Sequence, residues 1–123
     1  MNKNRPVNLN LATIKFPVTS MSSILHRITG VLLFLSIPLW LWALQASLTP
    51  AGFIEVKNIL SSGFAKFVSW SVLSLLAYHI IAGVRHLFMD AGIGESLEAG
   101  RAGAYIVIAL GVVSAALIGV WLW

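Results

Sequence analysis

Two histidines in the apolar stretch "YHIIAGVRHLFMD" (residues 78–90) share one face of any helix that contains them. The small residues between them leave room for a flat group to lie against that face. The sequence holds no cysteine, so a haem or metal bound within the chain would have to use histidine. We interpret this face as a haem site with an axial imidazole at depth. The face follows the spacing i, i+3, i+4, i+7 and carries His79, Ala82, Gly83 and His86.

A second interpretation of these histidines stays open at this point. A histidine inside an apolar helix is often a hydrogen-bonded interior residue, and this can apply to His79. His86 lies two helical turns, roughly 10 Å, nearer the end of the apolar run. There it can be an interface residue, with its polar tip in the headgroup region.

The start of the first apolar run carries a pair of hydrogen-bond donors. Ser23, Arg27 and Gly30 follow the spacing i, i+4, i+7 and share one helix face. A hydroxyl and a guanidinium at a membrane boundary can hold a carbonyl oxygen and stabilise negative charge that forms on it. A quinone undergoing reduction presents this need. The alternative is an N-cap serine beside an arginine on the cytoplasmic side of the membrane.

Three apolar segments are long enough to position these residues in a membrane. The chain has 123 residues, is 59% hydrophobic and only 10% charged, and has a mean hydropathy of +0.91. A helix that crosses a bilayer needs about 20 apolar residues. Segments of this length run over about 28–48, 67–89 and 103–123. The sequence therefore predicts an all-α membrane protein with three transmembrane helices in residues 20–123, after a polar cytoplasmic segment over 1–19.

Local signals refine this outline. The serines after Pro17 predict that the first helix begins near Ser20, and Pro38 predicts a kink within it. The loop over 49–66 is moderately apolar and is expected to lie along the membrane surface, whereas the loop over 91–102 is polar and rich in turn residues. Small residues at four-residue spacing predict that the third helix packs closely against another helix. These small or short residues are Gly103, Val107, Gly111, Ala115 and Gly119.

The positive charges predict the orientation of the chain. With three spans, six of the eight Lys and Arg residues fall on one side and two on the other. The positive-inside rule then places the N-terminus in the cytoplasm and the C-terminus in the periplasm. All five tryptophans fall on the periplasmic side, which is typical of an interfacial aromatic belt. The six cytoplasmic positive charges are Lys3, Arg5, Lys15, Arg27, Arg85 and Arg101.

Two motifs resemble those of one protein family. The segment "RPVNLNLATIKFPVTSMSSILHRITG" (5–30) carries Arg5-Pro6 and then Ser23, His26 and Arg27 in a Ser-x-x-His-Arg pattern. It resembles the first signature of the cytochrome b anchor subunit of bacterial succinate dehydrogenase, respiratory complex II. The resemblance extends over essentially the whole chain, including the three-span layout.

The second motif comes later in the chain. The segment "HIIAGVRHLFMDAG" (79–92) is similar to the second signature of the same family. Its pattern is His-x-x-x-Gly, then Arg-His, then a following Asp. Each motif alone is moderately specific, and the two in order, on the expected helices, are highly specific.

The resemblance implies a haem-binding membrane anchor for succinate:quinone oxidoreductase in the bacterial inner membrane. A second small three-helix subunit would complete the anchor and supply the other axial histidine of haem b. An iron–sulfur subunit and a flavoprotein subunit with FAD would deliver electrons from succinate to ubiquinone. Nucleic acid is not an expected partner. Two alternatives remain, namely a structural anchor with no direct quinone role and the cytochrome b anchor of a fumarate reductase.

The resemblance also assigns roles to individual residues. His79 matches the haem axial ligand, and Ser23 and Arg27 match quinone-binding residues. His26 and His86 match positions near the haem edge, where we expect them to approach the propionates. Arg85 and Asp90 are expected at the inner boundary, in contact with each other, the partner or the iron–sulfur subunit.

Overall fold

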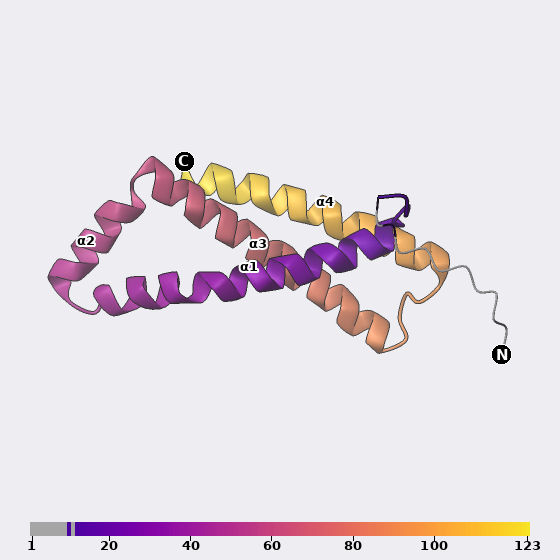
Figure 1. The fold of residues 1–123 in the computed structure, drawn as a ribbon. Helices are drawn as coiled ribbons and strands as arrows, with labels where there is room; N and C mark the ends of the chain where they lie inside the picture. Colours follow the sequence, from indigo (N-terminus) through magenta and orange to yellow (C-terminus); the bar gives the residue numbers. More distant parts are fainter. Residues whose placement is uncertain (1–9, 11) are drawn as a thin grey trace.

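The described residues form four helices, three of them long enough and apolar enough to cross a membrane. A computed structural model describes residue 10 and residues 12–123; Arg5 and Pro6 of the first motif lie outside the described residues. The fold is all-α, as the sequence predicts, and Figure 1 shows the course of the chain. The helices are α1 (Val18–Ala46), α2 (Pro50–Leu60), α3 (Gly63–Asp90) and α4 (Leu97–Leu122).

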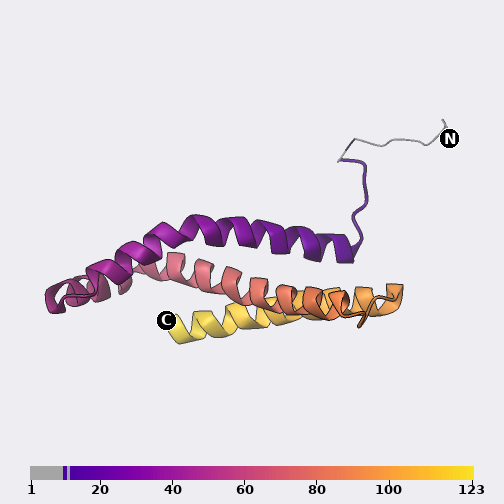
Figure 2. The same cartoon turned by 90° about the horizontal axis from the view of Figure 1, so that it is seen from below.

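Helix α1 begins earlier than the serines predicted. Its N-cap is Pro17, which makes no side-chain capping bond, and the first helical residue is Val18 rather than Ser20. The fixed backbone conformation of proline suits the position just before a helix. The helix therefore begins directly after Pro17, and the serines lie inside it. Pro38 lies within α1 without ending it, and Figure 2 shows that the helix bends along its length.

The expected surface loop over 49–66 contains a helix that the sequence analysis did not predict. Helix α2 is capped by Thr49, whose hydroxyl accepts a hydrogen bond from the Gly52 amide at 3.1 Å. Pro50 at the first helical position has no amide hydrogen to leave unpaired. In Figure 1 α2 links the far ends of α1 and α3 at the end of the molecule where the C-terminus lies.

The loop between α3 and α4 is shorter than expected. Ser96 caps α4 by accepting a hydrogen bond from the Ala99 amide at 3.2 Å, so the helix begins six residues before residue 103. Gly92 and Gly94 have φ values of 79° and 78°, a region that side chains with a Cβ rarely adopt. These two glycines allow the chain to reverse direction within a few residues.

Helices α3 and α4 lie side by side, and α1 crosses one face of the pair (Figures 1 and 2). The small-residue stripe of α4 faces α3, which confirms the predicted close packing. The Trp70 indole approaches Gly119 and donates from Nε1 to the Ala115 carbonyl at 2.8 Å. Most large apolar side chains point outward, as Phe34 does with 70% of its surface exposed. This surface suits contact with lipid and with partner helices.

Candidate functional site

The three histidines come together where α1 crosses α3. The rings of His26 and His79 stack with their centroids 4.1 Å apart and their planes inclined by 13°. The His86 ring lies 5.1 Å from that of His26 and is tilted by 50°. All three side chains are half-buried. The structure thus brings together three residues that the sequence placed on two separate helices.

Protein hydrogen bonds hold one nitrogen of the His79 ring. Nδ1 lies 3.0 Å from the Thr29 hydroxyl oxygen and 3.1 Å from the His26 carbonyl oxygen. The carbonyl can only accept, so a neutral His79 carries its proton on Nδ1 and donates to these oxygens. The lone pair of such an imidazole is on Nε2, which is the state in which histidine binds a metal ion.

Two glycines allow the helices to approach each other at this point. A Cβ added at Gly30 of α1 would stand 3.0 Å from Cε1 of His79. A Cβ added at Gly83 of α3 would stand 3.4 Å from Nε2 of His26. Each imidazole therefore lies against the backbone of the opposite helix.

An open groove adjoins the histidines on the side toward α2. Its volume is about 540 Å³, and its lining includes Gly30 and Leu33 from α1 and Leu76 from α3. Leu76 precedes His79 by three residues and therefore lies on the same side of α3. The groove is mainly apolar and includes none of the three histidines in its lining, but Gly30 both lines it and contacts the His79 ring.

Ser23 and Arg27 lie beside the histidine cluster rather than within it. Ser23 is half-buried and Arg27 is exposed, and both are one helical position further around α1 than the residues that face α3. The neighbouring Ser22 is fully buried, and its carbonyl accepts a hydrogen bond from the Tyr78 hydroxyl at 3.1 Å. Ser23 and Arg27 thus keep their side chains available to a ligand or partner.

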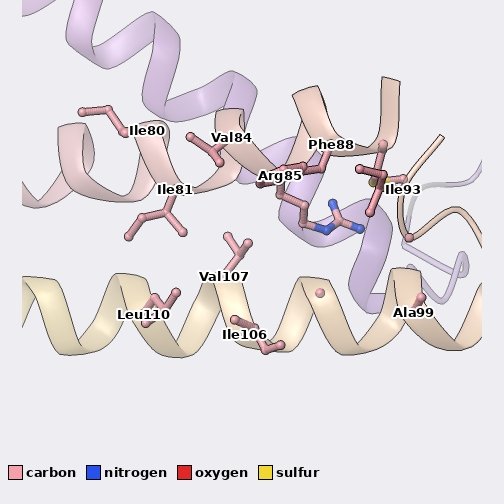
Figure 3. Close-up of a pocket in the computed structure, with 13 residues that line it drawn as sticks. Ile80, Ile81, Val84, Arg85, Phe88, Ile93, Ala99, Ile106, Val107 and Leu110 are labelled. Carbon is pink, nitrogen blue, oxygen red and sulfur yellow. The ribbon is translucent and has the colours of Figure 1, made fainter. Parts of the chain in front are cut away.

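Arg85 has a partner within the chain that the sequence did not predict. Its Nη2 donates to the Gly100 carbonyl at 3.0 Å, so it joins α3 to the start of α4. Figure 3 shows the guanidinium reaching from α3 toward α4 beside an open apolar groove of about 580 Å³. Asp90 is the last residue of α3 and is exposed. Both residues lie at the end of α3 next to the short loop.

The residues that sequence reasoning missed are those that hold the histidines in place. Thr29 and Tyr78 were given no role there, yet each forms a bond between α1 and α3. A signal for Thr29 was present, because it follows His26 by three residues and therefore shares its helix face. Tyr78 offered no such signal, since its partner is a backbone carbonyl 56 residues away.

The chain is similar to succinate dehydrogenase membrane subunits along its whole length. A family model described as the succinate dehydrogenase/fumarate reductase transmembrane subunit matches residues 1–118. The succinate dehydrogenase cytochrome b556 subunit of Coxiella burnetii is 41% identical, and the match covers 100% of both chains. The b556 subunit of Paracoccus denitrificans is 36% identical, over 93% of this chain and 88% of the relative.

A third relative is a cytochrome b560 subunit rather than a b556 subunit. The succinate dehydrogenase cytochrome b560 subunit of Reclinomonas americana is 34% identical, over 89% of this chain and 81% of the relative. These matches confirm the family that the two sequence motifs resembled. The chain therefore belongs to the succinate dehydrogenase/fumarate reductase transmembrane subunit family, as a cytochrome b membrane subunit of succinate dehydrogenase.

Proposed function

We propose that this chain is one half of a two-subunit membrane anchor that binds haem b and helps to form the quinone site of succinate dehydrogenase. The observation that carries the proposal is the hydrogen bonding of Nδ1 of His79. Its Nδ1 is held by Thr29 and by the His26 carbonyl, which leaves Nε2 to bind iron. The curated relatives are cytochrome b subunits, and that name supports a haem in this chain as well.

The surroundings of His79 fit a haem. The adjoining groove is apolar and open, as the porphyrin faces require, and Gly30 keeps side-chain atoms away from the His79 ring. The His26 and His79 rings stack face to face with their centroids 4.1 Å apart, which is too close for the two imidazoles to bind one iron atom from opposite sides. A second axial histidine from the partner anchor subunit agrees with this geometry.

His26 and His86 have a different part in the proposal. They lie beside His79 toward the end of α3 that carries Arg85 and Asp90. From there they can donate hydrogen bonds to the haem propionates. The haem, when bound, would supply one-electron transfer, while this chain would supply a ligand, an apolar groove and hydrogen-bond donors at the edge.

Ser23 and Arg27 are proposed to bind the quinone. A hydroxyl and a guanidinium one helical turn apart can donate to the same carbonyl oxygen and stabilise negative charge on it during reduction. Both side chains lie beside the histidine cluster, and neither is buried against α3. Electrons from succinate would reach this quinone through the FAD and iron–sulfur clusters of the flavoprotein and iron–sulfur subunits.

The charge distribution supports an orientation in the bacterial inner membrane. With three spans, the sequence assigns six of the eight positive residues to the side of the N-terminus and of the loop between α3 and α4. We infer that this side is cytoplasmic and that the C-terminus and α2 face the periplasm. The quinone site would then lie near the cytoplasmic boundary, where water can supply the two protons that quinone reduction consumes. The soluble subunits would dock on the same side, at the exposed Asp90 among other residues.

The haem assignment is tested with a His79→Ala variant of the whole complex. The reduced-minus-oxidised spectrum of the purified complex is expected to lose its b-haem bands. Ser22→Ala is a suitable control, because Ser22 is fully buried in α1 and its hydroxyl accepts a hydrogen bond from Tyr78 rather than bonding to His79. An unchanged haem spectrum in the His79→Ala complex would reject the ligand assignment.

The quinone assignment is tested with Arg27→Leu. Quinone reductase activity is expected to fall, while succinate oxidation with an artificial electron acceptor is retained, because that acceptor takes electrons before the membrane site. Arg101→Leu is the matched control, since Arg101 is also an exposed cytoplasmic-side arginine but lies on α4. Equal loss of both activities in Arg27→Leu would indicate an assembly defect, and normal quinone turnover would favour a purely structural anchor.

A further inference from the structure

Thr29 is one of only two polar residues that the described part of the chain buries, and its hydroxyl is shared between two groups. Its side chain is 5% exposed. Oγ1 donates its single proton to the His26 carbonyl of its own helix at 2.9 Å. The same oxygen lies 3.0 Å from Nδ1 of His79 on α3. Because the proton is already committed, Thr29 offers His79 only lone pairs.

The second neighbour of Nδ1 has the same character. The His26 carbonyl oxygen lies 3.1 Å from Nδ1 and can only accept. If Nδ1 carried a lone pair, it would face two further lone pairs within hydrogen-bond distance. The proton therefore resides on Nδ1, between two acceptors that both belong to the same turn of α1. The contacts also fix the rotation of the ring, because they hold one edge of it against α1.

We propose that Thr29 is a positioning residue that sets the tautomer, the orientation and the electron density of His79, and thereby lowers the reduction potential of the bound haem. The inference rests on the proposed role of His79 as haem ligand. A hydrogen bond donated from Nδ1–H makes the imidazole a stronger electron donor through Nε2. A stronger donor favours ferric over ferrous iron, so the potential falls.

The test compares Thr29→Val with Thr29→Ser in the assembled complex. Valine matches threonine in shape and lacks the hydroxyl, whereas serine keeps it. The midpoint potential of the haem, from a redox titration of its optical spectrum, is expected to shift to a more positive value in Thr29→Val. The electron paramagnetic resonance signal of the ferric haem is expected to change as well, because it reports the orientation of the axial ring. Thr29→Ser is expected to retain both values.

Ser22→Ala serves as the matched control. It removes a fully buried hydroxyl from the same helix, at a site whose hydrogen bond is with Tyr78 and not with the His79 ring. Its potential and ferric signal are expected to equal those of the unmodified complex. If the effect came from a loss of packing in α1, the potential and ferric signal of the Ser22→Ala control would change too. A change confined to Thr29→Val therefore identifies the hydrogen bond as its cause.

Two further outcomes decide the proposal, one against it and one in its favour. If Thr29→Val retains haem with an unchanged potential and ferric signal, the proposal is wrong. If Thr29→Val and Thr29→Ala both lose the haem while Thr29→Ser keeps it, the hydroxyl is required to present the ligand and the proposal stands. Failure here is distinct from failure of the proposed function, which would appear as a haem that survives His79→Ala.

Discussion

The ring of Tyr78 lies directly against the backbone of Gly111. A Cβ added at Gly111 would stand 2.7 Å from Cδ2 of Tyr78, closer than carbon atoms approach in packed proteins. The Tyr78 ring therefore occupies the space that a side chain on α4 would fill, and its hydroxyl continues to the Ser22 carbonyl on α1. One side chain of α3 thus contacts both of the other spanning helices.

Gly111→Ala is expected to destabilise the packing of α3 against α4. Overpacking a close contact costs about 1–3 kcal/mol, more than the roughly 0.5–1 kcal/mol gained by replacing a helical glycine. Thermal denaturation of the purified complex should show a lower melting temperature. Gly63→Ala is the control, because a Cβ there meets no atom within 4 Å. Equal melting temperatures for the two variants would contradict the contact.

Tyr78→Phe is expected to weaken the attachment of α1 to α3. The variant keeps the ring against Gly111 and loses the hydrogen bond to the Ser22 carbonyl, which is worth about 1 kcal/mol. Hydrogen exchange of the amides in the first turns of α1 should become faster. Tyr105→Phe removes a hydroxyl from a residue that is 64% exposed and should leave exchange unchanged. Similar exchange in both variants would show that the Tyr78 bond contributes little.

Gly30→Ala is expected to lower the haem content of the complex. The new Cβ would approach Cε1 of His79 to 3.0 Å, so the ring must shift by a few tenths of an ångström away from residue 30. Haem per flavin, measured from absorbance of the purified complex, is the appropriate readout. Full haem content with an unaltered spectrum would show that the ring has more freedom than the structure indicates.

Trp70→Phe distinguishes an interfacial anchoring role of Trp70 from its role as a hydrogen-bond donor to α4. A residue that only anchors the interface should tolerate phenylalanine, whereas loss of the bond from Nε1 to the Ala115 carbonyl should cost about 1 kcal/mol. Trp121→Phe is the comparison, because Trp121 is 76% exposed. We expect the melting temperature of the complex to fall more for Trp70→Phe. The reverse order would favour the interfacial role for Trp70.

Local patterns in the sequence predict much of this fold. The three spans follow from apolar segments of sufficient length, and the glycine spacing of α4 predicts its contact with α3. Helix α2 was missed because its moderately apolar segment was interpreted as a surface loop, although Thr49 at the N-cap and Pro50 at the first helical position are signals of a helix start. The start of α1 was misplaced because serines are common N-caps, whereas here Pro17 holds that position.

The sequence indicated which residues form the candidate site but not how their side chains are arranged in space. Spacing alone groups His79 with His86 and Ser23 with Arg27, because these pairs lie on single helices. The stack of His26 on His79 depends on how α1 crosses α3, and no local pattern encodes a contact between residues 53 positions apart. Thr29 shares a helix face with His26 but was given no role, since its importance comes from a ring on another helix.

The hydrogen bonds that join α1 to α3 are concentrated where the two helices cross, at the level of the histidines. Within a few turns of that crossing lie the bonds of Thr29 and Tyr78 and the close approach of Gly30 to His79. Beyond it, toward α2, the space between the two helices opens into a groove. We therefore expect the parts of α1 and α3 between the crossing and α2 to adjust when the lipid thickness or their apolar side chains change. The imidazoles at the crossing should then keep their mutual positions.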